Sequence, residues 1–597
     1  MLETRMWQSA HRFNTLLAVF AAITSIGAFT PFPAHADVIY VHSGANGTND
    51  GSSWSNAYIG LPQALVNCVS GDEVWVAGGV YTPVDADHSL NLVNGVGLYG
   101  GFSGIETNRE QRNPAVNPTI LSGDILQDDT VDSSPFAPPW PYNVNHNTAN
   151  ARKVIVADGV NSSTVLDGFQ IIKGGFGPGG GLYCTGSGLI VRNCHFAENF
   201  ANFSHGGAIY LLDSTASITD CTFYHNLAYQ GSGGAVFIAG ASTPTIRDCT
   251  FSSNMAVATN GQTGQGGAIQ IDTTLPVTIE RCTFDGNISK PFLTGSYEIP
   301  RGGAISSFCV ASDPTTTIRE CIFRNNQSAY GGAIFVWNPT QVLNCAVDHN
   351  TAFTYAGSGG QSVGGEGAGM TAQWTTITVL NCTIANNVGG ESSGVAVFEY
   401  IPNFPAEAIV RNSIIWGNIA LGQDVSPRNV GIRGNYSADY SCIQDLFTDE
   451  PGEDPIDPAN YPGCIAINPA FVSAATGNLR LLGNSPCIDA GRNSYVLSSM
   501  LLDLDGNARF INDPDVADTG HGTAPLVDMG AFEHAPALLL GDVNCDGVLN
   551  PADATALVGV LLGTDQVACH LSGADITGDQ SVNGLDIQAL VDALTGD

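Results

Sequence analysis

The chain of 597 residues is poor in basic residues: it has 20 lysines and arginines against 55 aspartates and glutamates, a formal net charge of -35. Nucleic-acid binding needs a basic surface that neutralises phosphates, so this composition argues against nucleic acid as a partner. The same shortage disfavours anionic membrane surfaces. Only 13% of residues are charged while 43% are apolar, which favours a folded protein with a large core over disorder.

Long hydrophobic runs are missing after the first 36 residues, so no membrane span is expected there. Residues 1–36 carry the features of a secretory signal, which are Arg5 and Arg12, the apolar stretch 16–29 and Ala34-His35-Ala36. We expect the mature chain to begin at Asp37. A retained N-terminal anchor is the alternative, but the apolar run is shorter than the about 20 residues of a span.

Heptads and long amphipathic runs are also missing, and a repeat takes their place. Its ending is a cysteine, an apolar residue two positions later and an asparagine three positions after that. Eight copies occur, at Cys194/Phe196/Asn199, Cys221/Phe223/Asn226, Cys249/Phe251/Asn254, Cys282/Phe284/Asn287, Cys321/Phe323/Asn326, Cys345/Val347/Asn350, Cys382/Ile384/Asn387 and Ser413/Ile415/Asn418. Subtracting these positions gives spacings of 24 to 39 residues, which predict a solenoid.

The beginning of each repeat is rich in glycine and runs into short alternating segments typical of strands. It recurs at Gly179, Gly206, Gly233, Gly266, Gly302, Gly331 and, in a decayed form, Gly367. Such units cannot bury their apolar faces alone, whereas stacking them as parallel strands aligns like residues into ladders. The sequence therefore predicts an all-β fold, a right-handed parallel β-helix, which resembles the pectin-lyase-like solenoids. Inward ladders are expected at Ile209, Val236, Ile269, Ile305 and Ile334, at Phe196 to Phe323, and at Asn199 to Asn418 in a turn.

Fifteen cysteines in an exported protein would ordinarily indicate disulfides. Seven of them occupy the same place in successive repeats, which instead predicts a buried ladder of thiols acting as small apolar groups. Metal binding by this ladder is disfavoured, because stacked side chains do not converge on a tetrahedral point. Two pairs remain candidate bridges, Cys442 with Cys464 and Cys545 with Cys569, and the connectivity stays open.

The pattern divides the chain into a signal at 1–36, an N-terminal cap and first coils at 37–150, regular repeats at 151–420, terminal coils and cap at 421–535, a linker at 536–541 and a C-terminal module at 542–597. Within the first cap, 55–68 is the helical candidate, and strands are expected at 73–77 and 96–99. A helix there would cover the open first coil. Trp54 and Trp75 are expected in the core of this cap rather than on a sugar platform.

Residues 37–535 resemble a bacterial group of exported β-helix proteins, the choice-of-anchor Q group. The densest motifs of this resemblance are 412–418, 485–491, 503–509 and 527–533. The group shares the solenoid, and the resemblance implies no common catalytic activity. The GGA[IV] and FxxN repeats are also similar to those of polymorphic outer-membrane adhesins, which leaves adhesion as a function.

Two stretches near the end of the sequence, 542–553 and 575–586, fit calcium loops, which need oxygen ligands at positions 1, 3, 5, 9 and 12 and a carbonyl at position 7. The first offers Asp542, Asn544, Asp546, the carbonyl of Val548, Asn550 and Asp553. The second offers Asp575, Thr577, Asp579, the carbonyl of Ser581, Asn583 and Asp586, with a poorer ligand in Thr577 and Gln580 in place of the turn glycine.

Each loop runs into an apolar helical pattern, at 554–562 and 587–594, and the loops start 33 residues apart (575 minus 542). Duplicated loop-helix units of this kind are similar to type I dockerins over residues 542–597. The resemblance implies bound Ca²⁺ and a cohesin-like protein or surface scaffold as partner. The alternative is a terminal domain that calcium stabilises without any partner. In either case calcium is expected to contribute to folding of so small a unit.

An enzymatic role is the main competing hypothesis, because parallel β-helices include polysaccharide lyases and hydrolases, but fold alone does not grant activity. The motif series NTD, DD, GHG and RIK of polygalacturonases is absent; Asp128-Asp129 and His521-Gly522 lack its companions. Candidate bases for a lyase are Arg192, Arg247, Arg281, Arg301 and Arg319, and candidate ligand contacts are His205 and Trp337. For each of these, an ordinary structural role is the favoured interpretation.

Insertions lengthen some repeats at 257–265, 290–301 and 353–366, and loops on a rigid solenoid are where binding is expected. They carry Phe292, Tyr297, Phe353 and Tyr355, which suit a glycan or a protein surface. The sequence therefore predicts an exported cell-surface or extracellular protein for adhesion or carbohydrate binding. A polysaccharide lyase or hydrolase is the alternative, and a purely structural envelope component is the third.

Overall fold

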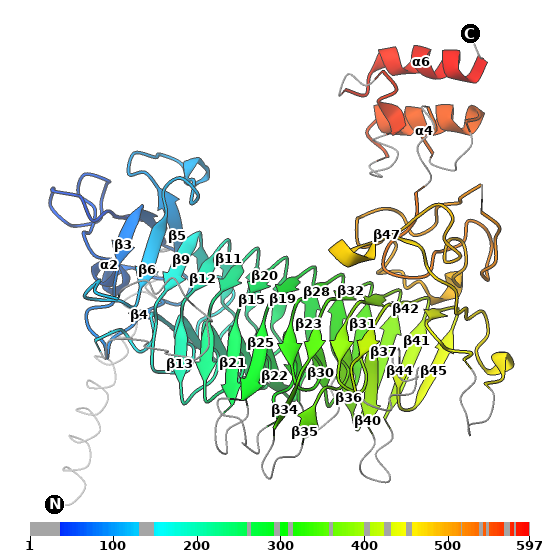
Figure 1. The fold of residues 1–597 in the computed structure, drawn as a ribbon. Coiled ribbons are helices and arrows are strands. Elements are labelled where there is room, and N and C mark those ends of the chain that lie inside the picture. The colour runs from blue at the N-terminus through cyan, green and yellow to red at the C-terminus, as the bar shows by residue number, and fades with distance from the viewer. Residues whose placement is uncertain are drawn as a thin grey trace, which may run out of the picture.

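The computed structural model describes most of the chain after residue 35 (Figure 1). The described residues are 36–129, 149–258, 264–291, 299–308, 315–356, 362–398, 406–422, 432–448, 456–514, 516–535, 541–544, 549–565, 573–577 and 581–595. The predicted signal at 1–36 and linker at 536–541 therefore lie almost wholly outside them. No helix in this part of the chain is long and apolar enough to cross a membrane.

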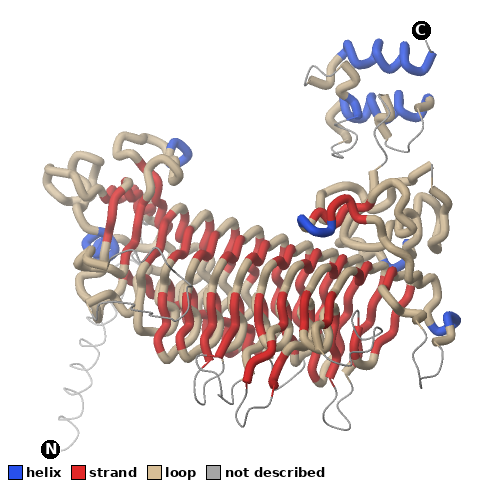
Figure 2. Tube along the Cα trace, in the orientation of Figure 1, coloured by secondary structure: helices blue, strands red, loops and turns tan. Residues whose placement is uncertain are grey.

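The described chain forms a right-handed parallel β-helix in which each coil passes through sheets named here C, A, B and, from β13 on, D (Figure 2). Strands of sheet A are β1 Val38–Val41, β2 Glu73–Ala77, β5 Gly97–Phe102, β8 Val165–Asp167, β11 Ile190–Arg192, β15 Ser217–Thr219, β19 Thr245–Arg247, β23 Val277–Glu280, β27 Thr316–Arg319, β31 Thr340–Leu343, β37 Thr376–Leu380, β41 Glu407–Arg411 and β45 Tyr436–Asp439. Strands of sheet B are β3 Gly79–Tyr81, β6 Thr119–Ser122, β9 Phe169–Ile172, β12 His195–Ala197, β16 Thr222–Tyr224, β20 Thr250–Ser252, β24 Thr283–Asp285, β28 Ile322–Arg324, β32 Ala346–Asp348, β38 Thr383–Ala385, β42 Ile414–Trp416 and β46 Cys442–Ile443.

The other two long sheets complete each coil. Strands of sheet C are β4 Leu90–Asn91, β7 Ile155–Asp158, β10 Leu182–Thr185, β14 Ile209–Leu212, β18 Val236–Gly240, β22 Ile269–Thr273, β26 Ile305–Ser307, β30 Ile334–Val336, β36 Met370–Gln373, β40 Val395–Phe398 and β44 Ile432–Arg433. Strands of sheet D are β13 Phe200–Asn202, β17 Leu227–Tyr229, β21 Met255–Ala258, β25 Ile288–Pro291, β29 Gln327–Ser328, β33 Thr351–Ala352, β39 Val388–Gly389 and β43 Ile419–Ala420.

The inward ladders predicted from the repeat are confirmed. Ile209, Val236, Ile269, Ile305 and Ile334 pair in register along sheet C and are fully buried. The phenylalanines of sheet B pair in the same way, and successive rings from Phe196 to Phe323 stack with centroids 4.5 to 5.1 Å apart. Burial of this continuous apolar column supplies most of the driving force for stacking the coils.

The asparagine ladder is also confirmed and lies where sheet B turns into sheet D. Each side-chain amide donates to the Oδ1 of the asparagine in the next coil, from Asn199 through to Asn418, at 2.9 to 3.0 Å. The same amide donates to the backbone of the preceding coil, as Asn226 Nδ2 does to Phe196 O at 2.9 Å. Backbone groups that a turn would leave unpaired are therefore satisfied inside the protein.

The paired glycines are required by backbone geometry. Gly206 has a φ of 67°, in the left-handed region, and a Cβ on Gly207 would lie 2.2 Å from Gly234 O. The second glycine thus lets adjacent coils approach more closely than any side chain would permit.

The cysteines of the repeat are buried free thiols, as predicted. The candidate bridge between Cys442 and Cys464 is wrong, since both residues are free thiols. Cys442 pairs with Ile465, so Cys464, one residue earlier, directs its side chain to the opposite face. Cys545 and Cys569 lie outside the described residues.

The N-terminal cap contains α2 Leu61–Asn67, shorter than the predicted helix, and η1 Arg109–Gln111. Trp54 and Trp75 belong to its aromatic core with Phe102, and the rings of Trp75 and Phe102 stack at 4.8 Å. Of the three insertions, the one at 353–366 contributes two strands, β34 Thr354–Ala356 and β35 Ser362–Gly364, which pair antiparallel. Phe292 and Tyr297 lie outside the described residues.

Residues 456–535 form a C-terminal unit (Figure 1). Its first part covers the end of the last coil, where Tyr461, Cys464 and Ala466 pack against the β-helix core, and the rest lies on the side of the late coils. Its elements are η3 Pro458–Asn460, the hairpin of β47 Phe471–Ser473 and β48 Asn478–Leu481, η4 Ala474–Thr476 and η5 Asn493–Tyr495. Residues just after a sheet A strand, at the corner toward sheet B, hold this unit in place. Asn344 Nδ2 donates to Leu502 O at 3.1 Å, and Asn412 exchanges two hydrogen bonds with the Arg492 backbone.

Candidate functional site

The C-terminal module consists of two loop-helix units with α4 Pro551–Leu561 and α6 Gly584–Thr595 side by side (Figure 1). Both helices are close to the predicted ranges. Asn550 caps α4 by accepting from Ala552 N, with Asp553 completing a capping box. Equivalent positions of the two units meet in one core, Val543 with Ile576 and Leu557 with Leu590. The duplication in sequence is thus a duplication in structure.

The last ligand position of each predicted calcium loop is occupied by a fully buried aspartate. Asp553 accepts from Asn544 N at 3.1 Å and Asn550 N at 2.8 Å. Asp586 accepts the equivalent bonds, from Thr577 N at 2.9 Å and Asn583 N at 2.8 Å. Both carboxylates therefore cross their loops from position 12 to positions 3 and 9, which draws the loop backbone around them.

The residues present fit a calcium ion, because Asp542, Asn544, Asn550 and Asp553 all offer side-chain oxygens and both Asp542 and Asp553 are buried. Burial raises the pKa of Asp586, but the N–H groups of Thr577 and Asn583 outweigh it and hold that pKa below its usual value. The carboxylate is thus ionised at neutral pH, as a metal ligand must be. Asp575 and Ser581 are described, whereas Asp546, Val548 and Asp579 lie outside the described residues.

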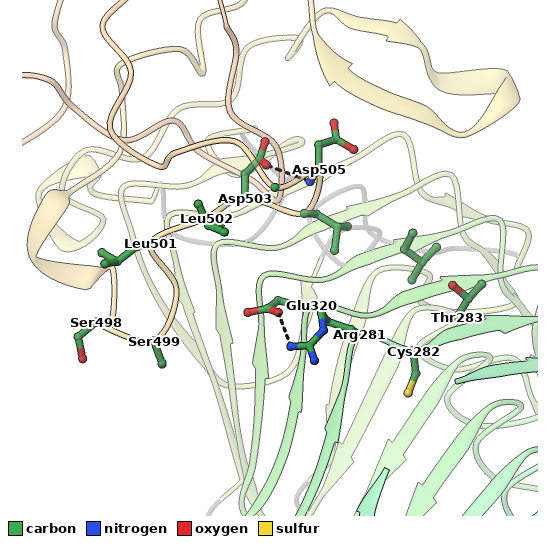
Figure 3. A pocket seen from close by; sticks show the side chains of 13 residues that line it. Arg281, Cys282, Thr283, Glu320, Ser498, Ser499, Leu501, Leu502, Asp503 and Asp505 are labelled. Atoms are coloured by element: carbon green, nitrogen blue, oxygen red, sulfur yellow. Dashed lines mark hydrogen bonds and ion pairs between the residues drawn. The ribbon is translucent and has the colours of Figure 1, made fainter. Parts of the chain in front are cut away.

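A groove of about 540 Å³ runs between the C-terminal unit and two coils of the β-helix (Figure 3). One wall carries Arg281 and Glu320 at the corner between sheets A and B, and the other wall is the segment 498–506. Leu501 and Leu502 are 54% and 53% exposed in this second wall. The volume falls in the range of about 300–1,000 Å³ typical of ligand sites.

The groove begins where the docking of the C-terminal unit ends. Successive coils place Arg281, Glu320, Asn344, Asn381 and Asn412 at the same corner, all with a positive φ. The asparagines at 344 and 412 bond the C-terminal unit, whereas Arg281 and Glu320 line the groove. Where this corner carries Arg281 and Glu320 the groove stays open, and where it carries Asn344 and Asn412 the C-terminal unit is bonded to the β-helix.

The wall of the groove on the C-terminal side is firmly held. Arg509 N donates to Leu501 O at 2.9 Å, and Met500 packs against Leu343 and Leu380 of the β-helix. Arg509 is fully buried, and its guanidinium donates to Gly530 O, Ala531 O and Asn344 Oδ1. The motifs 503–509 and 527–533 thus build this attachment, and the groove is preformed.

Each arginine that the sequence offers as a lyase base already has a partner inside the protein. Arg192 pairs with Asp167 at 2.8 Å, Arg281 with Asp248 at 2.7 Å and Arg319 with Glu280 at 2.7 Å, while Arg247 lies 3.3 Å from Asp248. Arg301 lies over the Trp337 ring, 4.4 Å from its centroid, and burial lowers its pKa to about 10.

His205 and Trp337, the candidate ligand contacts, and His521 all contact other side chains of the protein. His205 Nδ1 accepts from Ser232 N at 3.0 Å, and the ring stacks on Phe237. Trp337 stacks on Trp374 and donates to Gln373 at 2.6 Å. His521, in the C-terminal unit, makes an edge contact with Tyr440, which follows β45, and their ring centroids lie 6.0 Å apart. None of these three described residues lines the groove.

Asp128 and Asp129 have companions that sequence reasoning missed. Asp124, Asp128 and Asp129 each place a carboxylate oxygen within 4.8 Å of the others, and Lys173 Nζ lies 3.2 Å from Asp124 Oδ2. Lys173 comes from the following coil, about 45 residues away in the sequence, so no local motif could have found it.

Two parts of the chain match family models. Residues 180–365 match a right-handed β-helix region and residues 540–595 match the dockerin type I domain. No curated protein matches the chain. Among solved structures it is similar to pectate lyase Pel9A, with 13% identity over 84% of this chain and 97% of that chain and a TM-score of 0.34. It is also similar to a rhamnogalacturonan lyase, with 10% identity over 75% and 95% and a TM-score of 0.30. These structural likenesses carry no activity over to this chain.

Proposed function

We propose that this protein is an extracellular or cell-surface carbohydrate-binding β-helix that its calcium-loop module attaches to a cohesin-like protein or surface scaffold. The observation that carries the attachment is the pair of buried aspartates, Asp553 and Asp586, with equivalent bonds in two loops. The match of residues 540–595 to the dockerin type I domain supports the same conclusion.

The groove supports carbohydrate binding by the β-helix. Hydroxyl groups of Ser498 and Ser499 lie in its wall beside exposed leucines, so polar and apolar faces of a sugar chain both find contacts. The Arg281 charge is already balanced by Asp248, Glu280 and Glu320. Of the other charged groups in the lining, Asp505 is paired with Arg480 and Asp503 is buried, so the described lining offers no unpaired cation to an acidic sugar and neutral polysaccharides fit the groove better.

A polysaccharide lyase or hydrolase is the competing function. A lyase needs a basic group that can take a proton from the sugar, and a guanidinium held by a carboxylate is poorly suited to that task. Arg192, Arg281 and Arg319 are held in this way. The binding function is therefore the one that we favour.

The test of binding is retention of the full chain on a panel of immobilised neutral and acidic polysaccharides, with unsaturated products and reducing ends measured in the same samples. We expect retention on a neutral glycan without product. Leu501→Glu should reduce that retention at least tenfold, whereas Leu275→Glu, which adds the same charge at an exposed leucine away from the groove, should not. Product formation, or equal retention of both variants, would contradict the proposal.

The test of attachment is capture of the full chain by a panel of purified cohesin domains. Capture should require calcium and be lost in the double variant Asp553→Ala/Asp586→Ala, which should keep its retention on the glycan. Calcium-bound module without capture by any cohesin would favour the alternative in which calcium only stabilises the terminal domain.

A further inference from the structure

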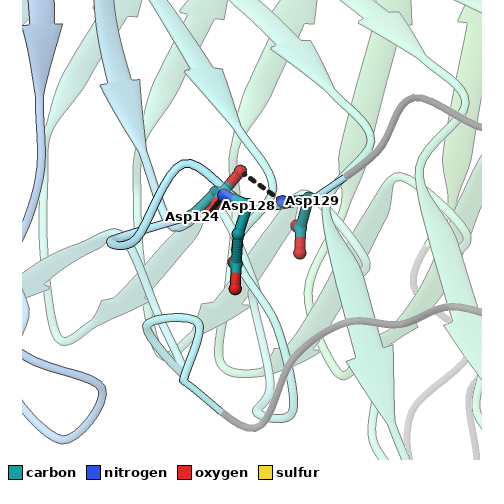
Figure 4. Close-up of side chains that lie close together, drawn as sticks. All are labelled: Asp124, Asp128 and Asp129. Carbon is teal, nitrogen blue, oxygen red and sulfur yellow. Dashed lines mark hydrogen bonds between the residues drawn. The ribbon is translucent and has the colours of Figure 1, made fainter.

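Three carboxylates gather at the start of the β-helix, far from the calcium loops in the sequence (Figure 4). Asp124, Asp128 and Asp129 follow β6, and oxygens of all three lie within 4.8 Å of one another. Asp124 accepts from the backbone of the other two, from Asp128 N at 3.1 Å and from Asp129 N at 3.2 Å. The loop is therefore curled around the Asp124 carboxylate.

Hydrogen bonds between two successive coils fix the backbone around these carboxylates. Gly123 N donates to Ile172 O, Ala151 N donates to Gly123 O, and Gly175 N donates to Ala151 O, at 2.8 to 2.9 Å. Asn150, next to Ala151, donates Nδ2 to Asp129 Oδ2 at 2.7 Å. The carboxylates and the Asn150 amide thus come from two segments that the β-helix itself holds together.

Two oxygens at this place are buried without a hydrogen bond. Within the described part of the chain, Asp129 Oδ1 and Asn150 Oδ1 have no hydrogen-bond partner, and Asn150 is only 1% exposed. A buried oxygen without a donor loses its hydration and gains nothing in return, at a cost of about 1–3 kcal/mol. Both oxygens belong to residues bonded to each other at the carboxylate cluster, so one cation would satisfy both.

The charge at this place is that expected for a divalent cation. Among the described residues these three carboxylates face the ammonium group of Lys173, whose Nζ lies 3.2 Å from Asp124 Oδ2 and 3.4 Å from Asp129 O. The balance is two negative charges. Asp128 is exposed, which leaves a path from solvent. Carboxylate and amide oxygens in irregular geometry suit Ca²⁺ better than Mg²⁺, which demands a near-ideal octahedron.

We propose that Asp124, Asp128, Asp129 and Asn150 form a calcium site that braces the first coils of the β-helix. The ion would join the loop after β6 to the segment before β7, and Asp124 would link it to Lys173 after β9. This site is separate from the loops of the C-terminal module and from the groove, so it stands or fails independently of the function proposed above.

The experiment is calcium titration by calorimetry of the chelator-treated full chain, in a background of Asp553→Ala and Asp586→Ala that disables the C-terminal loops. We expect one remaining site per chain. Asp128→Asn and Asp129→Asn should each weaken calcium binding at that site at least tenfold. Asp158→Asn, which removes one exposed carboxylate at the end of β7, is the matched control and should bind as the background does.

Folding of each variant is checked by circular dichroism, and Asp128, being exposed, is the position least able to disturb the fold. A second measurement is the melting temperature of the background chain, which calcium should raise and Asp128→Asn should make insensitive to calcium. Absence of any site in the folded background chain, or undiminished binding in folded Asp128→Asn and Asp129→Asn, would overturn the proposal.

Discussion

Asn254 donates its side-chain amide to Asn287 Oδ1 at 2.9 Å while its own Oδ1 accepts from the side chain of Asn226 at 2.9 Å. The same amide also donates to Phe223 O, and Asn254 Oδ1 also accepts from Asn226 N at 3.1 Å. One fully buried side chain therefore satisfies groups of the coils on both sides of it. The bonds repeat from coil to coil, so each asparagine depends on its neighbours.

Replacing Asn254 should destabilise the β-helix strongly. Asn254→Ala removes the acceptor of Asn226 N and Asn226 Nδ2 and the donor to Phe223 O, all buried, so we expect a loss of at least about 2 kcal/mol in the free energy of unfolding. Denaturant unfolding measures it. Ser437→Ala removes a bond to Glu407 on the surface and should cost less than about 0.5 kcal/mol. Similar losses for both variants would contradict the role of the ladder.

The thiol of Cys221 should be unreactive in the native protein. It is 1% exposed, and burial raises the pKa of this thiol well above its usual value, so the reactive thiolate is scarce. Labelling with an aromatic disulfide reagent, followed by mass spectrometry of peptides, should modify Cys221 only when denaturant unfolds the coil. Rapid modification without denaturant would show that the thiol ladder is accessible.

Mild acid should destabilise the β-helix in part through His205. Burial lowers the pKa of His205, and its Nδ1 accepts a backbone N–H that a protonated ring could not accept. A histidine whose pKa is lowered by folding stabilises the protein above its unfolded pKa of about 6.5, and this contribution is lost as the pH falls below that value.

His205→Gln keeps an oxygen that can accept from Ser232 but does not titrate. Its melting temperature should therefore fall less than that of the parent chain between about pH 7 and about pH 5. Burial also lowers the pKa of His195 and His225, so some pH dependence should remain. An identical decrease in parent and variant would mean that His205 does not contribute.

Asp586→Asn should weaken calcium binding by the second loop at least about tenfold, because ligand charge sets the affinity of such loops. Calorimetry on the full chain measures the affinity, and the melting temperature of the C-terminal module should become less sensitive to a chelator. Asp592→Asn, on the same helix outside the loop, is the control. Equal affinity in both variants would contradict the ligand assignment of Asp586.

Features that recur in the sequence were predicted correctly because a solenoid turns repetition into contact. Phe223 and Phe251 occupy the same place in two repeats, and their rings stack at 4.5 Å. The two helices of the C-terminal module were predicted for a similar reason, since Leu557 and Leu590 hold the same place in a duplication. In such cases spacing along the chain determines spacing in the structure.

Features that occur once were not predicted. The groove depends on Leu501 and Leu502 lying against coils that contain Arg281 and Glu320, about 180 to 220 residues earlier. The acidic cluster depends on Asn150 and Lys173 reaching Asp129 from other coils. No period relates these residues, so only the tertiary structure brings them together.

Because successive coils stack in register, the length of the β-helix is set by the number of its coils. Each coil contacts mainly its two neighbours in parallel strands, so one further coil between the N-terminal cap and the groove would lengthen the body by about 4.8 Å and leave both ends intact. Within the described residues the C-terminal unit is bonded to late coils, as at Asn344 and Asn412, and would move together with them. Duplication or loss of repeats can therefore change the distance between the groove and the N-terminal cap without any change in the residues of the groove or of the cap.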